Sequence, residues 1–316
     1  MKLLIIGLGN IGTAYGWALS EAGVDVTHRV RPGRAGDHAH GIVIDLLDRR
    51  EGHPDTQVVT YQPKVVEDVS PADGFDLVMA PTKHTQIAAS VREMNERLPE
   101  ARFLVFCAGW YAPQVIDEIL PRARYAWGYA SSTGGPAADR LVFNMAAVFR
   151  FGPIEGSYPP WADDVVDMFA RAGVTPDAKH DMVEWLWVHH AMVAAQVGSA
   201  CWLGGLKESV TAPNALRDFE IPATREALQV VEARGVDLSP YAEARPYFDL
   251  SLDEAVAALA WPTDSPWLQR TLDSGHYKSS MGEMQRFYFD VLETGEDLGV
   301  EMPVLSSFRE KVAAAG

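Results

Sequence analysis

The chain has 316 residues, 47% hydrophobic and 22% charged, which is typical of a globular protein with one large or two medium domains. The net charge of −16 at pH 7 argues against nucleic acid as a partner, because polyanions bind basic surfaces. Cys107 and Cys201 form no CxxC or zinc pattern, which favours a reducing compartment. The N-terminal run "MKLLIIGLGN" is too short for a signal peptide, and no stretch approaches the roughly 18 apolar residues of a membrane span. We therefore expect a soluble, cytoplasmic protein with no membrane partner.

The first half of the chain alternates strand-like and helix-like segments. Short apolar runs rich in β-branched residues predict strands, and apolar residues at helical spacing predict the helices between them. Strands that alternate with helices indicate a parallel sheet covered on both faces. The predicted strands are 2–7, 24–30, 75–81 and 102–109, and the predicted helices are 11–23 and 84–98.

Beyond about residue 165 the strand signals fade and helical patterns dominate. The segments with this pattern are 161–173, 182–203, 223–235, 251–260 and 282–299. We therefore predict an α/β fold, in which a doubly wound parallel sheet is followed by an all-helical C-terminal domain. The expected domains are 1–172 and 173–316, and no internal repeat is evident.

The glycines Gly7, Gly9 and Gly12 form a GxGxxG pattern between the first predicted strand and the first predicted helix. In this context Gly7 permits a tight turn, Gly9 lets the backbone approach a pyrophosphate, and Gly12 allows the helix to pack closely on the strand. The helix N-terminus then directs free N–H groups and a positive dipole end at the phosphates. The pattern predicts a Rossmann domain that binds a dinucleotide, and a chance cluster of loop glycines is the alternative.

The end of the second predicted strand indicates which dinucleotide is bound. An NAD site usually has an acidic residue there, whereas this chain has the sequence "RVRPGR". Arginine side chains suit a 2′-phosphate, which they can hold with two hydrogen bonds. We therefore predict NADP(H) as the cofactor, with Arg31 at the 2′-phosphate. The alternative is that Arg29, Arg31 and Arg34 are solvated loop charges.

Several segments together resemble the ketopantoate reductase family (2-dehydropantoate 2-reductases). The resemblance covers nearly the whole chain but is patchy, and it rests on segments from both halves. The segments that carry it are "GLGNIG", "PTKHTQ", "CAGW", "WGYASSTGG", "HYKSSMGEM" and "GEDLGVEMPV". The resemblance implies a Rossmann domain for the cofactor and a helical domain for substrate binding and dimerisation.

The resemblance also implies a set of cofactor-binding residues. Lys83 would be a second phosphate-binding residue, Gln86 a contact on the cofactor side, and the pair Ala108–Gly109 would lie beside the nicotinamide. The full implied set is Gly7, Leu8, Gly9, Asn10, Ile11, Gly12, Arg31, Lys83, Gln86, Ala108 and Gly109.

The chain departs from the family pattern where the substrate would bind. The family's catalytic lysine follows a tryptophan by two residues, and that position is His189 here, or Val188 if the register shifts by one. Two following asparagines become Val193 and Val197. The cofactor-side asparagine becomes Ala108, an asparagine before the second motif serine becomes Tyr277, and the segment with the family's glutamate is shortened. A carboxylate in a dry pocket needs cations or several donors, so we expect a larger or less polar carbonyl or imine rather than ketopantoate.

His189 is the main catalytic candidate. Hydride transfer to a carbonyl leaves an alkoxide, and an imidazole with a pKa near its ordinary value of about 6.5 can donate a proton to it. A structural histidine bonded to a backbone carbonyl is the alternative. His190 points about 100° away on the same helix, as a supporting or interface residue. Tyr277 and Ser280 are candidate hydrogen-bond donors, although Tyr277 could be a core residue and Ser280 could cap the next helix.

Other residues are read as structural. Adjacent histidines on a helix diverge, and His180 with Glu184 lacks a third ligand, so no metal site is expected. Cys107 and Cys201 lie in apolar runs and are expected to be small buried hydrophobic residues. Three aromatic residues could shape a pocket, although packing is their commoner role; they are Trp110, Tyr129 and Trp187.

We therefore predict an NADPH-dependent oxidoreductase that reduces a carbonyl or imine of a small organic substrate. Two alternatives remain open, namely an NADP(H)-binding sensor or inactive homologue, and a genuine 2-dehydropantoate 2-reductase. The expected partner is a small-molecule substrate; a homodimer remains open, because the sequence does not define the oligomeric state.

Overall fold

The computed structural model describes residues 1–177 and 180–315. Its contacts divide the chain into two compact units. The first unit comprises Met1–Met182 together with Asp273–His276, and the second comprises Val183–Leu272 and Tyr277–Gly316. The division thus falls later in the sequence than the boundary predicted after residue 172. The segment Asp273–His276 joins the first unit, where the N–H of Gly275 donates to the carbonyl of Pro136 at 3.2 Å.

The first unit contains an eight-stranded sheet in the order β12-β11-β8-β7-β6-β1-β2-β5. All of its strand pairs are parallel except β11 with β8, which is antiparallel. This arrangement confirms the predicted doubly wound parallel sheet. The strands are β1 (Lys2–Ile6), β2 (Asp25–Arg29), β5 (Val65–Val66), β6 (Leu77–Ala80), β7 (Arg102–Phe106), β8 (Tyr125–Ala130), β11 (Val148–Phe151) and β12 (Thr175–Asp177).

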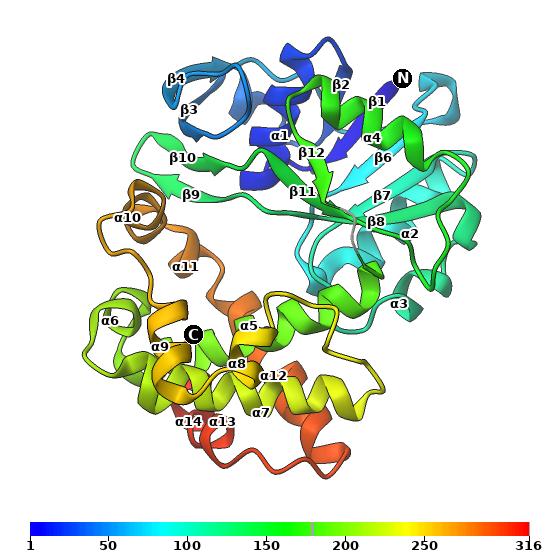
Figure 1. Ribbon diagram of the computed structural model, residues 1–316. Coiled ribbons are helices and arrows are strands. Elements are labelled where there is room, and N and C mark those ends of the chain that lie inside the picture. Colours follow the sequence, from blue (N-terminus) through cyan, green and yellow to red (C-terminus); the bar gives the residue numbers. More distant parts are fainter. Residues whose placement is uncertain (178–179, 316) are drawn as a thin grey trace. The chain divides into compact units, whose positions relative to one another are not determined.

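Helices lie on both faces of this sheet (Figure 1). Alternate residues of the central strands point to opposite faces, and both sets are buried, which explains the continuous apolar runs in the sequence. On one face the core includes residues of α1 and α4, with Phe149 and Phe169 stacked at 4.2 Å between ring centroids. The helices of the first unit are α1 (Asn10–Glu21), α2 (Ile87–Arg97), α3 (Gln114–Asp117) and α4 (Ala162–Arg171), with 3-10 turns η1 (Ala35–His38), η2 (Pro71–Asp73), η3 (His84–Gln86) and η4 (Arg122–Arg124).

A second sheet of four strands, which the sequence did not predict, packs on the other side of α1. Its order is β4-β3-β10-β9, and its strands are β3 (Ile42–Asp48), β4 (Thr56–Tyr61), β9 (Thr133–Ala137) and β10 (Arg140–Met145). Residues of β3 and β10 share one core with α1. At the end of β3 the buried carboxylate of Asp48 pairs with the guanidinium of Arg50 at 2.7 Å. Helix α1 is therefore buried from two sides, which holds its N-terminus in place.

The second unit is helical in its described part, as predicted, and α5 (Met182–Leu203) spans the predicted range. Gly198 of α5 allows close packing, because a Cβ there would lie 2.5 Å from a ring carbon of Phe308. No helix among the described residues is long and apolar enough to cross a bilayer. The other helices are α6 (Leu206–Thr211), the π-helix η5 (Leu216–Glu220), α7 (Ile221–Ala233), α8 (Arg245–Asp249), α9 (Leu252–Leu259), α10 (Pro266–Asp273), α11 (His276–Ser279), α12 (Met281–Asp297), α13 (Pro303–Ser307) and α14 (Arg309–Ala313). By the division above, the end of α10 and the start of α11 lie in the first unit.

Candidate cofactor and catalytic sites

The glycine motif forms a tight turn between β1 and α1. Gly7 has φ +84°, a left-handed conformation that favours glycine, and its N–H donates to the carbonyl of Arg29 at 2.8 Å. Gly9 precedes α1 with extended backbone, and a Cβ at this residue would meet no protein atom within 4 Å. A Cβ on Gly12 would lie 3.1 Å from the carbonyl oxygen of Gly7. The three glycines thus have the conformation, the open space and the close backbone contact that a dinucleotide-binding turn requires.

A pocket of about 610 Å³ opens in front of this turn, and we call it the glycine-turn pocket. The first N–H groups of α1 have no intrahelical partner, and no acidic residue lies in its first turn. Two buried polar atoms of the lining, Thr82 Oγ1 and Arg29 Nε, have no hydrogen-bond partner among the described residues. The features suit an anionic ligand with hydroxyl groups. The lining residues are Ile6, Gly7, Leu8, Gly9, Arg29, Val30, Arg31, Arg34, His38, Pro81, Thr82, Lys83, Gln86, Ser90 and Glu93.

The loop after β2 brings cations to the pocket. Arg31 is exposed and pairs with no carboxylate among residues 1–177 and 180–315, whereas Arg34 Nε lies 2.5 Å from Asp37 Oδ2. The Glu67 carboxylate fixes this loop, since it accepts the N–H of Ala35 at 2.9 Å. Hydrogen bonds from the N–H groups of Gly33, Ala35 and Arg34 lower the pKa of Glu67 below its usual value. The sequence did not point to Glu67, because only the fold places β5 beside β2.

The predicted cofactor residues divide into two groups. Gly7, Leu8, Gly9, Arg31, Lys83 and Gln86 line the glycine-turn pocket. The other five do not line it and contact protein instead; they are Asn10, Ile11, Gly12, Ala108 and Gly109. The side chain of Asn10 donates to the carbonyl of Gly134 at 3.0 Å, Ile11 packs on the core, and Gly12 contacts the turn.

Ala108 and Gly109 follow β7 and are packed against protein. Ala108 is buried, and a Cβ on Gly109 would lie 2.6 Å from Trp127 Cζ2. The indole N–H of Trp127 donates to the carbonyl of Cys107 at 2.8 Å. Gly109 therefore makes room for the Trp127 ring, a steric requirement that explains the glycine without a ligand.

His189 lies in the first half of α5 and is half-buried. Its imidazole stacks on the indole of Trp185, with ring centroids 5.0 Å apart and planes 11° apart. The indole N–H of Trp185 donates to the Glu243 carboxylate at 2.5 Å. Val188, the alternative register, is fully buried. Of the two positions, only that of His189 leaves part of the side chain accessible.

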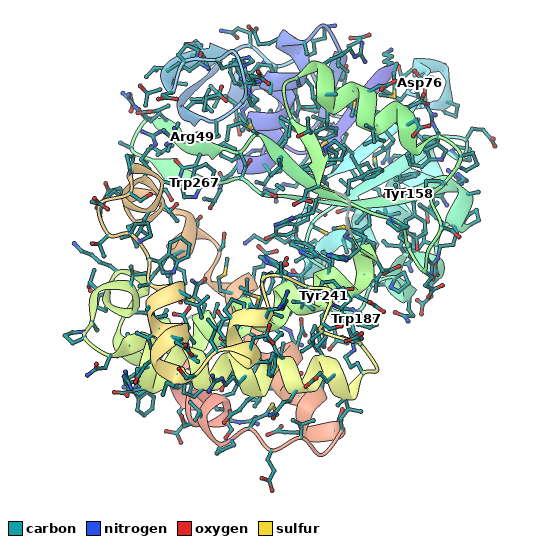
Figure 2. The ribbon with its side chains drawn as sticks, viewed as in Figure 1. Arg49, Asp76, Tyr158, Trp187, Tyr241 and Trp267 are labelled. Atoms are coloured by element: carbon teal, nitrogen blue, oxygen red, sulfur yellow. The ribbon has the colours of Figure 1, made fainter. Side chains whose placement is uncertain are left out.

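The segment around Glu243 makes further contacts with this end of α5, and its residue Tyr241 is labelled in Figure 2 together with Trp187 of α5. The Tyr241 hydroxyl donates to the Glu184 carboxylate at 2.6 Å. The guanidinium of Arg234 lies 3.5 Å from the ring centre of Trp187, a cation–π contact that accounts for this tryptophan as a packing residue. These contacts hold the part of α5 that precedes His189.

His190 has a different environment. It is fully buried, and its ring stacks on Phe287 of α12 with centroids 4.1 Å apart. Its Nε2 lies 3.5 Å from Asp290 Oδ2, and the Asp290 carboxylate also pairs with Arg286. His190 therefore joins α5 to α12, which suits the supporting role more than a direct one.

Tyr277 lies beside the C-terminal part of α5. The Tyr277 hydroxyl is 3.8 Å from the Cys201 sulfur, and Cys201 follows His189 by twelve residues, about 18 Å along a helix. Ser280 precedes α12 and is buried, but its side chain makes no capping hydrogen bond. Glu283, in the first turn of α12, is an additional carboxylate that the sequence analysis did not single out.

The remaining predicted positions show how apolar α5 is. Val193 is half-buried and Val197 is buried, so Val197 has little surface to offer a ligand. Trp110 is a core residue with 1% exposure. Cys107 is buried, and burial raises the pKa of the half-buried Cys201 thiol, which keeps it protonated. Among the described residues no cluster of three metal-ligating side chains occurs.

Residues 3–152 match the family model described as ketopantoate reductase PanE/ApbA. No curated protein matches the chain in sequence. Solved structures match it over almost its whole length. A D-mandelate dehydrogenase, solved as a ternary complex with NADH and anilino(oxo)acetate, has a TM-score of 0.75 and 14% identity and covers 100% of this chain and 98% of its own.

Two ketopantoate reductases are also similar over the whole length of the chain. The 2-dehydropantoate 2-reductase from Geobacter metallireducens GS-15 has a TM-score of 0.70 and 16% identity, with 100% of each chain covered. The dimeric ketopantoate reductase from Staphylococcus aureus has a TM-score of 0.63 and 15% identity, with 99% of each chain covered. Residues 3–152 therefore match the ketopantoate reductase PanE/ApbA domain, and the whole chain shares the fold of solved ketopantoate reductases.

Proposed function

We propose that the protein is an NADPH-dependent reductase that transfers a hydride to the carbonyl or imine carbon of a small, relatively apolar substrate. The observation that carries the proposal is the glycine-turn pocket, where an open glycine turn and a helix N-terminus lie beside the cationic side chains of Arg31, Arg34 and Lys83. Fixed N–H groups and cations together suit a dinucleotide that bears an extra phosphate.

The preference for NADPH rests on the loop after β2. Arg31 is exposed there, and Glu67 holds the backbone of the loop in one conformation. A preorganised cation costs less to bring to a 2′-phosphate than a mobile one. The D-mandelate dehydrogenase of similar fold is described with NADH, so likeness supports a nicotinamide cofactor in general, and the cations of this chain support the phosphorylated form.

His189 is proposed as the proton donor. The cofactor supplies the hydride that reduces the substrate carbon, and the electron pair of the double bond moves to the oxygen or nitrogen. The imidazole of His189 holds a proton that it gives to this atom. The Trp185 indole beneath the ring, fixed by Glu243, orients the imidazole. Tyr277 and Ser280 are given no part in this step, because the Tyr277 hydroxyl lies beside Cys201, which is about 18 Å along α5 from His189.

The substrate is proposed to be less polar than a small keto acid. Val193 lies one helical turn after His189 and cannot hydrogen-bond a carboxylate. An apolar surface with a few polar groups favours organic substrates that hide most of their surface. A homodimer is also proposed, since one solved relative is described as dimeric.

The test is an assay of NADPH oxidation with a panel of aldehydes, ketones, imines and ketopantoate. Turnover of apolar carbonyls or imines above ketopantoate supports the proposal. Ketopantoate as the best substrate would make the protein a 2-dehydropantoate 2-reductase. Tight NADPH binding without turnover of any compound would instead indicate a sensor or an inactive homologue.

A further inference from the structure

The glycine-turn pocket contains a pair of opposite charges that the cofactor signature does not explain. Arg29 is the last residue of β2 and has 8% exposure. Its Nη1 lies 3.4 Å from Oε2 of Glu93, and its Nη2 pairs with the other carboxylate oxygen. Glu93 belongs to α2 and also lies 3.6 Å from the Nε of Arg97. The pair joins two elements that are distant in sequence, and both of its members line the pocket.

The Arg29–Glu93 pair lies at the end of β2, the second strand of the sheet. The end of the second strand is where NAD-binding domains usually place an acidic residue for the ribose. Here that position holds the cation of Arg29, and the carboxylate comes from α2 instead. Arg29 Nε is buried without a hydrogen-bond partner among the described residues, so the guanidinium keeps an unused donor beside the pocket.

The two members of the pair differ in solvent access, which determines how they respond to a ligand. The side chain of Arg29 is 9% exposed, whereas that of Glu93 is 41% exposed. A buried guanidinium needs a nearby anion, and Glu93 supplies it. While the pair is intact, the charge of Arg29 is neutralised by Glu93 and adds little attraction for a phosphate. A carboxylate at this place repels a 2′-phosphate but accepts hydrogen bonds from ribose hydroxyls.

We propose that Glu93 is a specificity-determining residue that limits the preference of the pocket for NADPH over NADH, by occupying Arg29. The inference rests on the proposed function, because it presumes that a nicotinamide dinucleotide binds in this pocket. The inference predicts that the preference for NADPH over NADH changes with the net charge of the Arg29–Glu93 pair, which is zero in the wild type.

The test measures dissociation constants of NADPH and NADH by calorimetry, which needs no knowledge of the substrate. In Glu93→Gln the pair becomes positive, and the ratio of NADH to NADPH dissociation constants should rise about five-fold or more, the effect of one charge near a dianion in a partly solvated site. In Arg29→Met the pair becomes negative, and the ratio should fall by a similar factor. The double variant should return to within about two-fold of the wild type.

Matched variants keep the test decisive. Glu96→Gln removes an exposed carboxylate from the same helix but outside the pocket, and its ratio should stay at the wild-type value. If Glu93→Gln does not fold because Arg29 is left buried without its partner, Arg29→Met and the double variant still decide the question. Wild-type ratios in Glu93→Gln and Arg29→Met, with both dinucleotides bound, would overturn the inference alone. Binding of neither dinucleotide by the wild type would overturn the proposed function.

Discussion

The imidazole of His28 contacts the glycine turn, and its Nδ1 lies 3.0 Å from the carbonyl oxygen of Gly7. A carbonyl only accepts, so Nδ1 carries the proton, and Nε2 then accepts from the Tyr61 hydroxyl at 2.9 Å. The ring is neutral in this arrangement and fully buried. A side chain of β2 thereby connects the cofactor turn to β4 of the second sheet.

The buried His28 predicts a loss of stability in mild acid. Burial lowers the pKa of His28 from 6.5 to about 4, and the hydrogen bond to Gly7 opposes this shift. The unfolded chain therefore binds the proton more readily, so stability is complete above pH 6.5 and falls as the pH drops toward 4. The contribution is about 3 kcal/mol at most. Denaturant unfolding of wild type and His28→Gln at pH 7 and pH 4.5 measures it, and equal pH dependence of the two proteins would refute it.

Two glycines of the same region should respond differently to alanine. Gly9→Ala places a methyl group where no protein atom lies within 4 Å, on backbone that alanine tolerates. The melting temperature should stay unchanged, while NADPH affinity falls about ten-fold or more through contact with the phosphates. Gly16→Ala is the control, because its Cβ would lie 2.5 Å from His28 Nε2 and should cost about 1–3 kcal/mol of stability. Gly9→Ala with undiminished NADPH affinity would place the cofactor elsewhere.

Loss of the Glu67 carboxylate should weaken the binding of NADPH more than the binding of NADH. Without its carboxylate the N–H groups of Gly33, Arg34 and Ala35 lose their acceptor, and the loop that presents Arg31 loses its fixed conformation. In Glu67→Ala we expect NADPH affinity to fall about five-fold and NADH affinity to fall less than about two-fold. Glu118→Ala, an exposed carboxylate after α3, is the control. An equal loss for both cofactors would mean that the loop does not read the 2′-phosphate.

The adjacent histidines of α5 should separate in function. His189→Ala should lower turnover about 100-fold or more at unchanged NADPH affinity, if the imidazole donates the proton. His190→Ala should instead lower stability by about 2–4 kcal/mol, because it leaves a cavity against Phe287 and removes a neighbour of the buried Asp290. Turnover and chemical denaturation of both variants give the comparison. Normal turnover in folded His189→Ala would remove it from the mechanism.

Apolar periodicity and turn residues in the sequence predicted those elements whose formation depends on residues close in the chain. The glycine turn, α1 and the long apolar α5 lie where the patterns placed them, since periodicity and turn residues act within a few positions. The four-stranded sheet was missed because its two hairpins, β3–β4 and β9–β10, were not recognised as strands and are joined only by β3 and β10, which pair across almost a hundred residues. Spacing identifies no such partner.

The residues of the glycine-turn pocket likewise divide into those that the sequence indicated and those that depend on the packing of distant segments. Arg31, predicted from its place after the second strand, and Lys83, implied by the family resemblance, both line the glycine-turn pocket, whereas Arg29 was considered only as one of several loop charges. Its burial and its pairing with Glu93 depend on how α2 packs beside β2, which no short pattern encodes. The sequence likewise could not show that His189 is half-buried and Val188 fully buried, because this difference depends on how α5 packs.

The most direct test of the account is a calorimetric titration of the wild-type protein with NADPH, repeated with Gly9→Ala and Arg31→Ala. The account predicts one site per chain with a dissociation constant on the order of 10 µM or tighter, weakened about ten-fold or more by either substitution. Absence of binding, or binding that neither substitution weakens, would contradict it.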